Sequence, residues 1–428
     1  MKQSVDSILK EALKKVNPEK EETKKIKKAL DIFLVKLKER IFKLGLEVDV
    51  FVGGSYAKGT MIKKDHYDID IFLRFNEKYE DSKLSGMTSK ILEKIAKAET
   101  LHGSRDYFRL KTDDNLYFEI VPVRKVKKPE EAANITDLSY SHVKYIYDKI
   151  KNQEILDEIK IAKAFCHANN CYGAESYVNG FSGYALELLV YYYGGFINFL
   201  NGVSKEKSKD KIIIDIEKKY KDKRQIMIDI NSSKLQSPII LIDPTYKQRN
   251  ALAALSYETF AKFVKDSRAF LKNPTINAFE IKKTDLDKIK KDATKKKYYY
   301  VLVEAETNRQ EGDIAGSKLL KFYRHLEEEI SRFYEIKNKG FNYNKKQKSR
   351  FFYVAKPKNE IIIEGPNAKD KSNVFEFRRK HKSIFTNKGR VYAREKVKYN
   401  LSEFIENWKK KNSRKVKEMY ITKIKVIE

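Results

Sequence analysis

The segment FVGGSYAKGTMIKKDHYDIDIF, residues 51–72, sets two aspartates one residue apart at the end of a glycine-containing stretch. Apolar residues alternate with Asp68 and Asp70, which predicts a β-strand that carries both carboxylates on one face. Two adjacent carboxylates repel each other unless a cation lies between them, and Mg²⁺ prefers oxygen ligands of this kind. The pair indicates a metal site, although the polar face of an edge strand accounts for it as well.

The loop GGSYAKGT, residues 53–60, precedes this strand. Gly53 and Gly54 permit a close approach of the backbone, and Ser55 offers a hydroxyl and an amide to an anion. Glycine pairs also occur in ordinary turns, so the loop indicates a function only together with the carboxylates. A phosphate-binding loop beside two metal-binding aspartates is what phosphoryl transfer from a nucleoside triphosphate requires, with two ions about 3.5–4 Å apart.

A third carboxylate is expected on a neighbouring strand, where it would bind the ion that activates the nucleophile. Glu119 lies inside the β-rich segment LYFEIVPVRKV, residues 116–126, and is the candidate. The alternative is a glutamate on the solvent-facing side of a strand. We favour the metal-binding interpretation because Glu119 lies within the strand and not in a turn.

Composition limits the class of protein. The 428 residues include 90 Lys and Arg against 60 Asp and Glu, a formal net charge of +30. This excess is spread along the chain, which indicates either a lysine-rich surface or a polyanionic partner such as nucleic acid. The hydrophobic fraction of 41% is sufficient for packed cores, so we expect a globular protein.

Cysteine and histidine are too sparse for a zinc site or a disulfide framework. Cys166 and Cys171 are the two cysteines, and the six histidines are scattered. This usage indicates a reducing, cytoplasmic setting. The most apolar stretch, residues 181–200, contains Glu187 and a Gly-Gly pair, which predicts a buried helix and no membrane span.

The order of the segments predicts an α+β, multidomain fold. Residues 1–145 begin with two helices interrupted at Pro18 and continue with short β-rich segments, so we expect an α/β domain there. Residues 146–275 are mostly helical in pattern. Residues 276–428 combine strands and helices and interleave aromatic with basic residues, which indicates a third, α/β unit.

These motifs carry a resemblance to a known family. The loop GGSYAKGT followed by DID resembles the nucleotidyltransferase superfamily of DNA polymerase beta. The segments ITDLSYSHVKYI, CYGAESYVNGFSGYALELLV and LIDPTYKQRNALAALSYETFAKFV resemble, in order and spacing, the archaeal-type (class I) CCA-adding enzymes, which are tRNA nucleotidyltransferases. The resemblance runs from about residue 25 to 275 and continues more weakly through GSKLLKFYRHLEEEI and NLSEFIENW.

The resemblance implies a polymerase-beta-like catalytic head, a helical neck, and a C-terminal tRNA-binding body and tail. It also implies one site that uses two Mg²⁺ ions, CTP and ATP to add C, C and A to the 3′ end of tRNA without a nucleic-acid template. The implied catalytic and metal-binding residues are Asp68, Asp70 and Glu119. The implied nucleotide-binding residues are Gly54, Ser55, Lys58, Ser139, His142, Lys163, Tyr172 and Arg249, the last of which helps to select C or A.

This chain departs from the family pattern at three of these positions. Glu119 stands where the family usually has aspartate, Lys58 replaces an arginine, and Ser139 replaces a threonine. The first change lengthens a metal ligand by one methylene, and the second removes a bidentate guanidinium. We still expect activity.

Two other classes of function share the head motifs. One is another nucleotidyltransferase, either a poly(A)-type polymerase or a synthase of nucleotide messengers. The other is an RNA-binding protein with a decayed active site, which the change at Glu119 would explain. For the leading interpretation, we expect the acceptor arm of tRNA to be recognised by shape, sugar and phosphate. The state of assembly, including a homodimer, is left open by the sequence.

Overall fold

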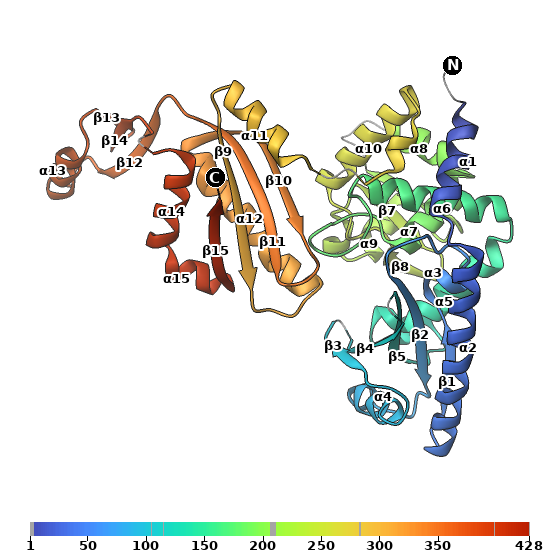
Figure 1. Cartoon of the computed structure of the whole chain (residues 1–428). Coiled ribbons are helices and arrows are strands. Elements are labelled where there is room, and N and C mark those ends of the chain that lie inside the picture. The colour runs from blue at the N-terminus through green and yellow to red at the C-terminus, as the bar shows by residue number, and fades with distance from the viewer. Residues whose placement is uncertain are drawn as a thin grey trace. The chain divides into compact units, whose positions relative to one another are not determined.

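The computed structural model shows a chain that divides into two compact units, Met1–Lys282 and Lys283–Glu428 (Figure 1). Both helices and sheets contribute substantially to it, which confirms the expected α+β class. The described residues are 4–103, 105–113, 115–205, 211–281, 284–397 and 399–427.

A five-stranded sheet forms the first part of the first unit. Its central strands β2 and β5 run parallel, whereas the other neighbours are antiparallel. This arrangement places the strand of Glu119 directly beside the strand of Asp68 and Asp70. In order across the sheet the strands are β1 (Val48–Val52), β2 (Tyr67–Phe75), β5 (Leu116–Arg124), β4 (Tyr107–Asp113) and β3 (Glu99–Leu101). Strands β3 and β4 were not predicted from the sequence.

Helices α2 (Lys20–Lys43) and α4 (Leu84–Leu92) cover one face of this sheet. The apolar residues of α2 recur every three or four positions, so they form one stripe that packs on Ile69 and Ile71 of β2. Because side chains alternate along a strand, Asp68 and Asp70, which alternate with these isoleucines, project to the opposite face. The core thus fixes the direction of both carboxylates.

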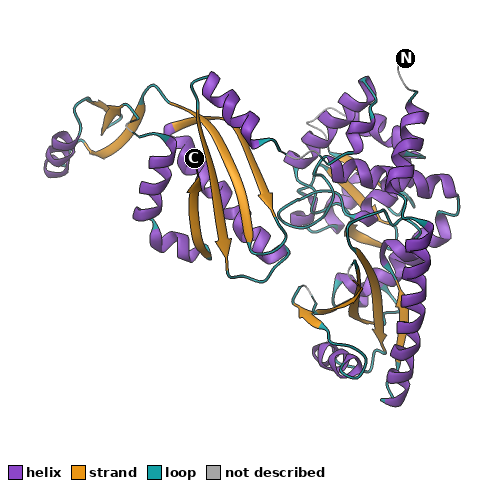
Figure 2. Ribbon diagram, viewed as in Figure 1, coloured by secondary structure: helices purple, strands orange, loops and turns teal. Residues whose placement is uncertain are grey.

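Helices dominate the rest of the first unit, as expected (Figure 2). The helices are α5 (Ser139–Lys149), α6 (Gln153–Ala168), α7 (Gly183–Tyr193), α8 (Phe196–Lys205), α9 (Lys223–Asp229) and α10 (Tyr257–Lys272). All of them except α9 share a second hydrophobic core with α1 (Val5–Val16), whereas α9 packs in a smaller cluster with β7 (Ile239–Asp243).

Two details of this helical part differ from the prediction. Residues 181–200 do not form one helix, because Gly194 and Gly195 have φ angles of +69° and +132° and separate α7 from α8. A small sheet also lies among the helices, which the sequence pattern did not reveal. Its strands are β6 (Ile212–Ile214), β7 (Ile239–Asp243) and β8 (Tyr246–Asn250).

The second unit contains a four-stranded sheet that is covered on both faces. Phe351 and Tyr353 pack with α12 (Asp313–Phe333), and the alternate residues Phe352 and Val354 pack with α11 (Leu286–Lys295). Burial on both faces explains the continuous apolar run in RFFYVA. The strands in order are β10 (Tyr334–Tyr343), β11 (Lys348–Pro357), β9 (Tyr299–Thr307) and β15 (Ile421–Ile427).

A three-stranded sheet and three further helices complete the second unit (Figure 2). The strands in order are β12 (Ile361–Asn367), β14 (Arg390–Glu395) and β13 (Ile384–Asn387), and the helices are α13 (Lys371–Lys380), α14 (Leu401–Lys411) and α15 (Ser413–Glu418). Among the described residues of the chain, no helix combines the length and apolar character needed to cross a membrane.

Candidate active site

Asp70 and Glu119 are register partners in the parallel pair of β2 and β5. Asp68, two residues before Asp70, is paired with Tyr117, two residues before Glu119. Because residues two apart in a strand share a face, the three carboxylates project from the same face of the sheet. The structure therefore brings together the three residues that the sequence suggested as one acidic group.

The electrostatics of this group favour a bound cation. Desolvation raises the pKa of Glu119 to about 7, and the negative charges of Asp68 and Asp70 add to the effect. Desolvation also raises the pKa of Asp70 to about 6, against the opposing charge of Lys58. An oxygen-only donor set whose carboxylates repel one another fits a hard divalent ion such as Mg²⁺.

Arg109 of β4 contacts two of these carboxylates. Its Nη2 donates a hydrogen bond to Asp68 Oδ1 over 3.0 Å, and its Nε lies 3.7 Å from Glu119 Oε1. Within the described part of the chain, no three His, Cys, Asp or Glu side chains are already arranged to hold a metal ion. An ion that uses Asp68, Asp70 and Glu119 therefore requires these side chains to adjust.

The glycine loop lies against the acidic group. Gly54 opens the short helix α3 (Gly54–Ala57) with a φ angle of +61°. A Cβ atom added at Gly54 would come within 1.7 Å of Asp70 Oδ2, so glycine is required there both for conformation and for space. The backbone N–H of Gly53 donates to the carbonyl of Asp70 over 2.8 Å. Ser55, the second residue of α3, is half-buried.

Lys58 and Lys163 meet at one buried carboxylate, that of Glu187. Lys58 Nζ lies 2.6 Å from Glu187 Oε2, and Lys163 Nζ lies 2.8 Å from Glu187 Oε1. Lys163 also donates to the hydroxyl and the carbonyl of Thr60, so its three donors are all engaged. Two lysines against one carboxylate leave a net positive charge next to Asp70.

The pKa values of this group reflect the imbalance of charge. Burial lowers the pKa of Lys163 to about 8, and the charge of Lys58 adds to this effect while Glu187 opposes it. Burial also opposes ionisation of Glu187, but the attraction of Lys163 and Lys58 outweighs it and lowers the pKa to about 2. We conclude that Glu187 is the residue firmly held in its charged form.

Tyr172 lies beside Lys163. A Cβ atom added at Gly183, the first residue of α7, would meet the Tyr172 hydroxyl at 2.8 Å and Lys163 Cε at 3.9 Å. The tyrosine ring stacks on the His167 ring with 4.0 Å between the centroids. Burial raises the pKa of Tyr172 well above its ordinary value, so its hydroxyl stays protonated and able to donate a hydrogen bond.

His142 and Arg249 converge on Asp243, a residue that the sequence analysis did not single out. Asp243 Oδ2 lies 2.9 Å from His142 Nε2 and 2.6 Å from Arg249 Nη1, and Tyr184 donates to Oδ1 over 3.0 Å. Asp243 is fully buried. Burial alone would raise its pKa, but the hydrogen bond and charge of His142, with the charge of Arg249, hold the pKa well below its usual range.

Burial lowers the pKa of His142, against the pull of Asp243. The His142 ring stacks on Tyr184 with 4.2 Å between centroids. Lys58 Nζ lies 5.9 Å from the Tyr184 ring centroid, so Tyr184 lies between the lysine group and the Asp243 group. Asp243 and Tyr184 thus link His142 and Arg249 to Lys58.

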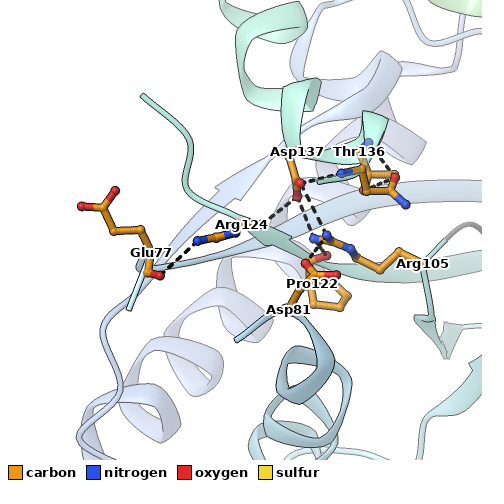
Figure 3. A network of polar contacts seen from close by, with 8 residues as sticks. Glu77, Asp81, Arg105, Pro122, Arg124, Thr136 and Asp137 are labelled. Atoms are coloured by element: carbon orange, nitrogen blue, oxygen red, sulfur yellow. Dashed lines mark hydrogen bonds and ion pairs between the residues drawn. The ribbon is translucent and has the colours of Figure 1, made fainter. Parts of the chain in front are cut away.

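A polar network around Asp137 anchors the start of α5, the helix that carries Ser139 and His142 (Figure 3). Arg105 Nη1 lies 2.7 Å from Asp137 Oδ1 and 3.2 Å from the carbonyl oxygen of Pro122. The backbone N–H of Arg124 also donates to Asp137 Oδ1, over 2.8 Å. Asp137 therefore connects the end of β5, the strand of Glu119, to α5. Ser139 is the first residue of α5 and is half-buried.

Three residues of this site were missed in the sequence analysis: Arg109, Glu187 and Asp243. Glu187 carried a signal, because a single acid within the apolar stretch of residues 181–200 needs a buried partner. Asp243 stands at the end of the apolar run SPIILID, before a proline, which also marks an acid that follows a buried strand. Nothing in the sequence around Arg109 indicates that it reaches Asp68.

Family profiles match most of the first unit. The profile described as a nucleotidyltransferase domain matches residues 34–160, and the profile described as the second domain of tRNA nucleotidyltransferase matches residues 157–280.

Curated relatives include CCA-adding enzymes of archaea. The one from Nanoarchaeum equitans is 42% identical over 63% of this chain and 66% of its own length. The one from Methanocaldococcus jannaschii is 28% identical over 91% of this chain and 87% of its own length. The chain thus spans 66% and 87% of the lengths of these two relatives.

Solved structures show the same fold at low identity. A cytoplasmic RNA terminal U-transferase has a TM-score of 0.51 and 13% identity, and covers 65% of this chain and 99% of its own. A poly(U) polymerase bound to Mg and 3′-dATP has a TM-score of 0.50 and 14% identity, with 64% and 98% covered. About two thirds of this chain therefore has the fold of these two proteins.

Proposed function

We propose, from the premise that this chain belongs to the family of CCA-adding enzymes, that it adds C, C and A to the 3′ end of tRNA from CTP and ATP. The observation that supports this most is the register pairing of Asp70 with Glu119, with Asp68 on the same face and Gly54 against Asp70. Residues 1–145 are the proposed catalytic head, 146–275 the neck, and 276–428 the tRNA-binding body and tail.

Asp68, Asp70 and Glu119 are the proposed ligands of two Mg²⁺ ions. Such ions stabilise charge on the transferred phosphoryl group and favour ionisation of the attacking 3′-hydroxyl. Glu119 is one methylene longer than the usual aspartate. Because it is the register partner of Asp70, its longer side chain can bend so that its carboxylate reaches an ion shared with Asp68 and Asp70. This geometry is the reason we expect the change from aspartate to be tolerated.

The triphosphate is proposed to lie between the glycine loop and the lysine group. Gly54 and Ser55 present backbone N–H groups and a hydroxyl at the start of α3. Lys58 exposes 9% of its side chain, whereas Lys163 exposes 2%. Lys58 is therefore the residue that can exchange Glu187 for a phosphate oxygen, and Lys163 contributes mainly its charge. The Tyr172 hydroxyl donates from the same side.

Nucleotide choice is proposed to depend on the group around Asp243. Arg249 is held at Asp243 with 23% of its side chain exposed, so part of the guanidinium can reach a base. Guanidinium and imidazole donors in a fixed frame distinguish acceptors on a base edge by geometry. Ser139 and His142 lie on the helix that Asp137 anchors, and this helix therefore sets the position of the proposed sugar and base contacts.

The tRNA is proposed to bind through shape and phosphate contacts to its acceptor arm. A formal charge of +30 supplies cations for a polyanion, so affinity should fall steeply as salt rises.

The test is incubation of full-length protein with a tRNA that lacks its last three nucleotides, with CTP, ATP and Mg²⁺. We expect the tRNA to gain C, C and A and then to stop. Tailing with ATP alone, or formation of soluble nucleotide products without RNA, would contradict the proposal. The matched variant Asp70→Asn should lose addition by a factor of about a thousand or more while tRNA affinity changes less than a few fold, because the lost group acts on the reacting phosphate.

A further inference from the structure

Arg109 bridges two strands of the acidic group from a third. It is the register partner of Glu119 in the antiparallel pair of β4 and β5. Its guanidinium crosses to Asp68 on β2, where Nη2 donates over 3.0 Å. The Arg109 side chain therefore links Glu119 of the adjacent strand β5 with Asp68 of the next strand, β2.

The Tyr117 ring lies against the Arg109 side chain. The guanidinium carbon lies 4.2 Å from the Tyr117 ring centroid, within the range of a cation–π contact. Tyr117 is the register partner of Asp68 in β5, so the ring lies next to the carboxylate that the guanidinium reaches. The ring supports the cation without forming a directional bond to it.

The bonds of Arg109 are incomplete. Its Nε is buried and has no hydrogen-bond partner, and the Nε–Glu119 Oε1 separation of 3.7 Å is an ion-pair contact only. Arg109 and Asp68 expose 34% and 38% of their side chains. A partly exposed guanidinium that is held by one hydrogen bond, a loose ion pair and a ring can leave Asp68 without a large loss.

We propose that Arg109 is an internal counter-ion of the acidic group, which pairs with Asp68 and Glu119 when no divalent ion is bound and must release Asp68 before an ion can use it. Arg109 is in this sense a positioning residue that sets the affinity for the divalent ion. The proposal rests on the assignment of Asp68, Asp70 and Glu119 as metal ligands.

Competition of this kind has two opposite consequences. Without a divalent ion, Arg109 reduces the repulsion among the carboxylates and so stabilises the sheet. When a divalent ion binds, the positive charge of Arg109 repels it and occupies Asp68, so the ion binds more weakly than it would to the three carboxylates alone. A structural salt bridge with no part in ion binding would show only the first consequence.

The test is titration of full-length protein with Mn²⁺ in the absence of nucleotide, with free Mn²⁺ measured by electron paramagnetic resonance. We expect Arg109→Met to bind Mn²⁺ at least about fivefold more tightly than the wild type, because a nearby positive charge is lost. The thermal midpoint of the same variant in chelator should be lower. Mn²⁺ affinity that is unchanged or weaker in Arg109→Met would overturn the proposal.

Arg74→Met is the matched control. Arg74 is the register partner of Asp49 in the pair of β1 and β2. Its Nη1 lies 3.9 Å from Asp49 Oδ2, and its guanidinium carbon lies 3.9 Å from the centroid of the Tyr140 ring. It has the same kind of cross-strand ion pair and ring contact without touching Asp68 or Glu119. We expect its Mn²⁺ affinity to stay within about twofold of the wild type; a gain equal to that of Arg109→Met would overturn the proposal.

Two further variants complete the design. Asp70→Asn should weaken Mn²⁺ binding strongly, and unchanged binding there would mean that the ion lies elsewhere and would overturn the proposal. If Arg109→Met does not fold, Arg109→Gln answers the same question, because it removes the charge and keeps a donor for Asp68.

Addition of nucleotides to tRNA, measured on the same preparations, separates this inference from the proposed function. An active wild type whose Mn²⁺ affinity does not respond to Arg109 leaves the function standing and overturns the inference. If the wild type adds no nucleotides but Arg109→Met binds Mn²⁺ more tightly than the wild type, the inference stands and the proposed function is overturned.

Discussion

Glu187 and Lys163 form a buried ion pair, with 2.8 Å between Oε1 and Nζ, where helices α6 and α7 pack together. Lys58 reaches the other oxygen of the same carboxylate from the loop that follows α3. The pair thus joins the glycine loop of the sheet domain to two helices that come much later in the chain. A change at Glu187 should reach the loop that lies against Asp70.

We predict that Glu187→Gln lowers the free energy of unfolding by about 3–5 kcal/mol at neutral pH, because it leaves buried lysines without a counter-charge. Urea unfolding of the full-length protein would measure this. Glu21→Gln is the control: Glu21 pairs with Lys24, but both side chains are largely exposed, so its unfolding should be nearly unchanged. Equal effects of the two variants would contradict the prediction.

The same pair should make stability depend on pH. The lysines lower the pKa of Glu187, against the effect of burial, from 4.5 to about 2. The ionised Glu187 contributes its full share to the free energy of unfolding above about pH 4.5, and this share is lost as the pH falls toward about 2. The Glu187→Gln variant has no such pH-dependent share to lose. The stability difference between the two proteins should therefore shrink between about pH 5 and about pH 3. A difference that stays constant over this range in urea unfolding would show that Glu187 is not the titrating group.

Gly54→Ala should affect the active site more than the fold. The added Cβ would come within 1.7 Å of Asp70 Oδ2 and would push the carboxylate away. We expect nucleotide addition to fall at least about tenfold, together with Mn²⁺ affinity, because ligand geometry tolerates little displacement.

Gly45→Ala separates that clash from backbone strain. Gly45 has a φ angle of +63°, close to the +61° of Gly54, but an added Cβ there meets nothing within 4 Å. Both variants should lose about 1 kcal/mol of stability through the left-handed conformation. Only Gly54→Ala should lose activity, and a comparable loss in Gly45→Ala would contradict the geometric explanation.

Asp243→Asn should change the choice between CTP and ATP. The carboxylate holds Arg249 and His142, so its neutralisation frees both donors from their fixed frame. We expect the ratio of kcat/KM for CTP and ATP to change by about tenfold or more, with tRNA affinity within a few fold. Arg249→Ala should act in the same direction, and the double variant should add little to it.

Asp229→Asn is the control for this experiment. Asp229 lies 3.9 Å from Lys247 Nζ, and Lys247 precedes Arg249 in β8. Asp229 and Asp243 each pair with a basic residue of β8, but Asp229 pairs with Lys247 and not with Arg249. Selectivity that changes equally in Asp229→Asn would mean that the effect comes from the local fold and not from the Asp243 frame.

The acidic residues of β2 and β5 could be predicted because they obey local rules. Asp68 and Asp70 are two residues apart in a strand pattern, so their common face follows from the geometry of one strand. Glu119 could be suggested because it lies within a second such strand. The strand of Arg109, by contrast, was not predicted, and its contact with Asp68 requires a third strand on the far side of β5.

The lysines illustrate the same limit. Lys58 and Lys163 were predicted from a resemblance of motifs, and the resemblance gives no information on partners within the fold. The structure shows that both share Glu187, which leaves Lys163 without a spare donor. Selection of phosphate contacts from sequence alone would have treated the two lysines as equivalent, whereas their exposure differs.

The sequence by itself determined the α+β class, the face shared by Asp68 and Asp70, and the presence of a glycine loop before them, because these depend on neighbours a few residues apart. Only the tertiary structure decided which charges pair. Asp243 with Arg249 and His142, Glu187 with two lysines, and Arg109 with Asp68 are brought together by packing of distant segments. Burial makes the pairings of Asp243 and Glu187 obligatory, since an unpaired charge in a core is far more costly than one in water, whereas the partly exposed pair of Arg109 and Asp68 can separate.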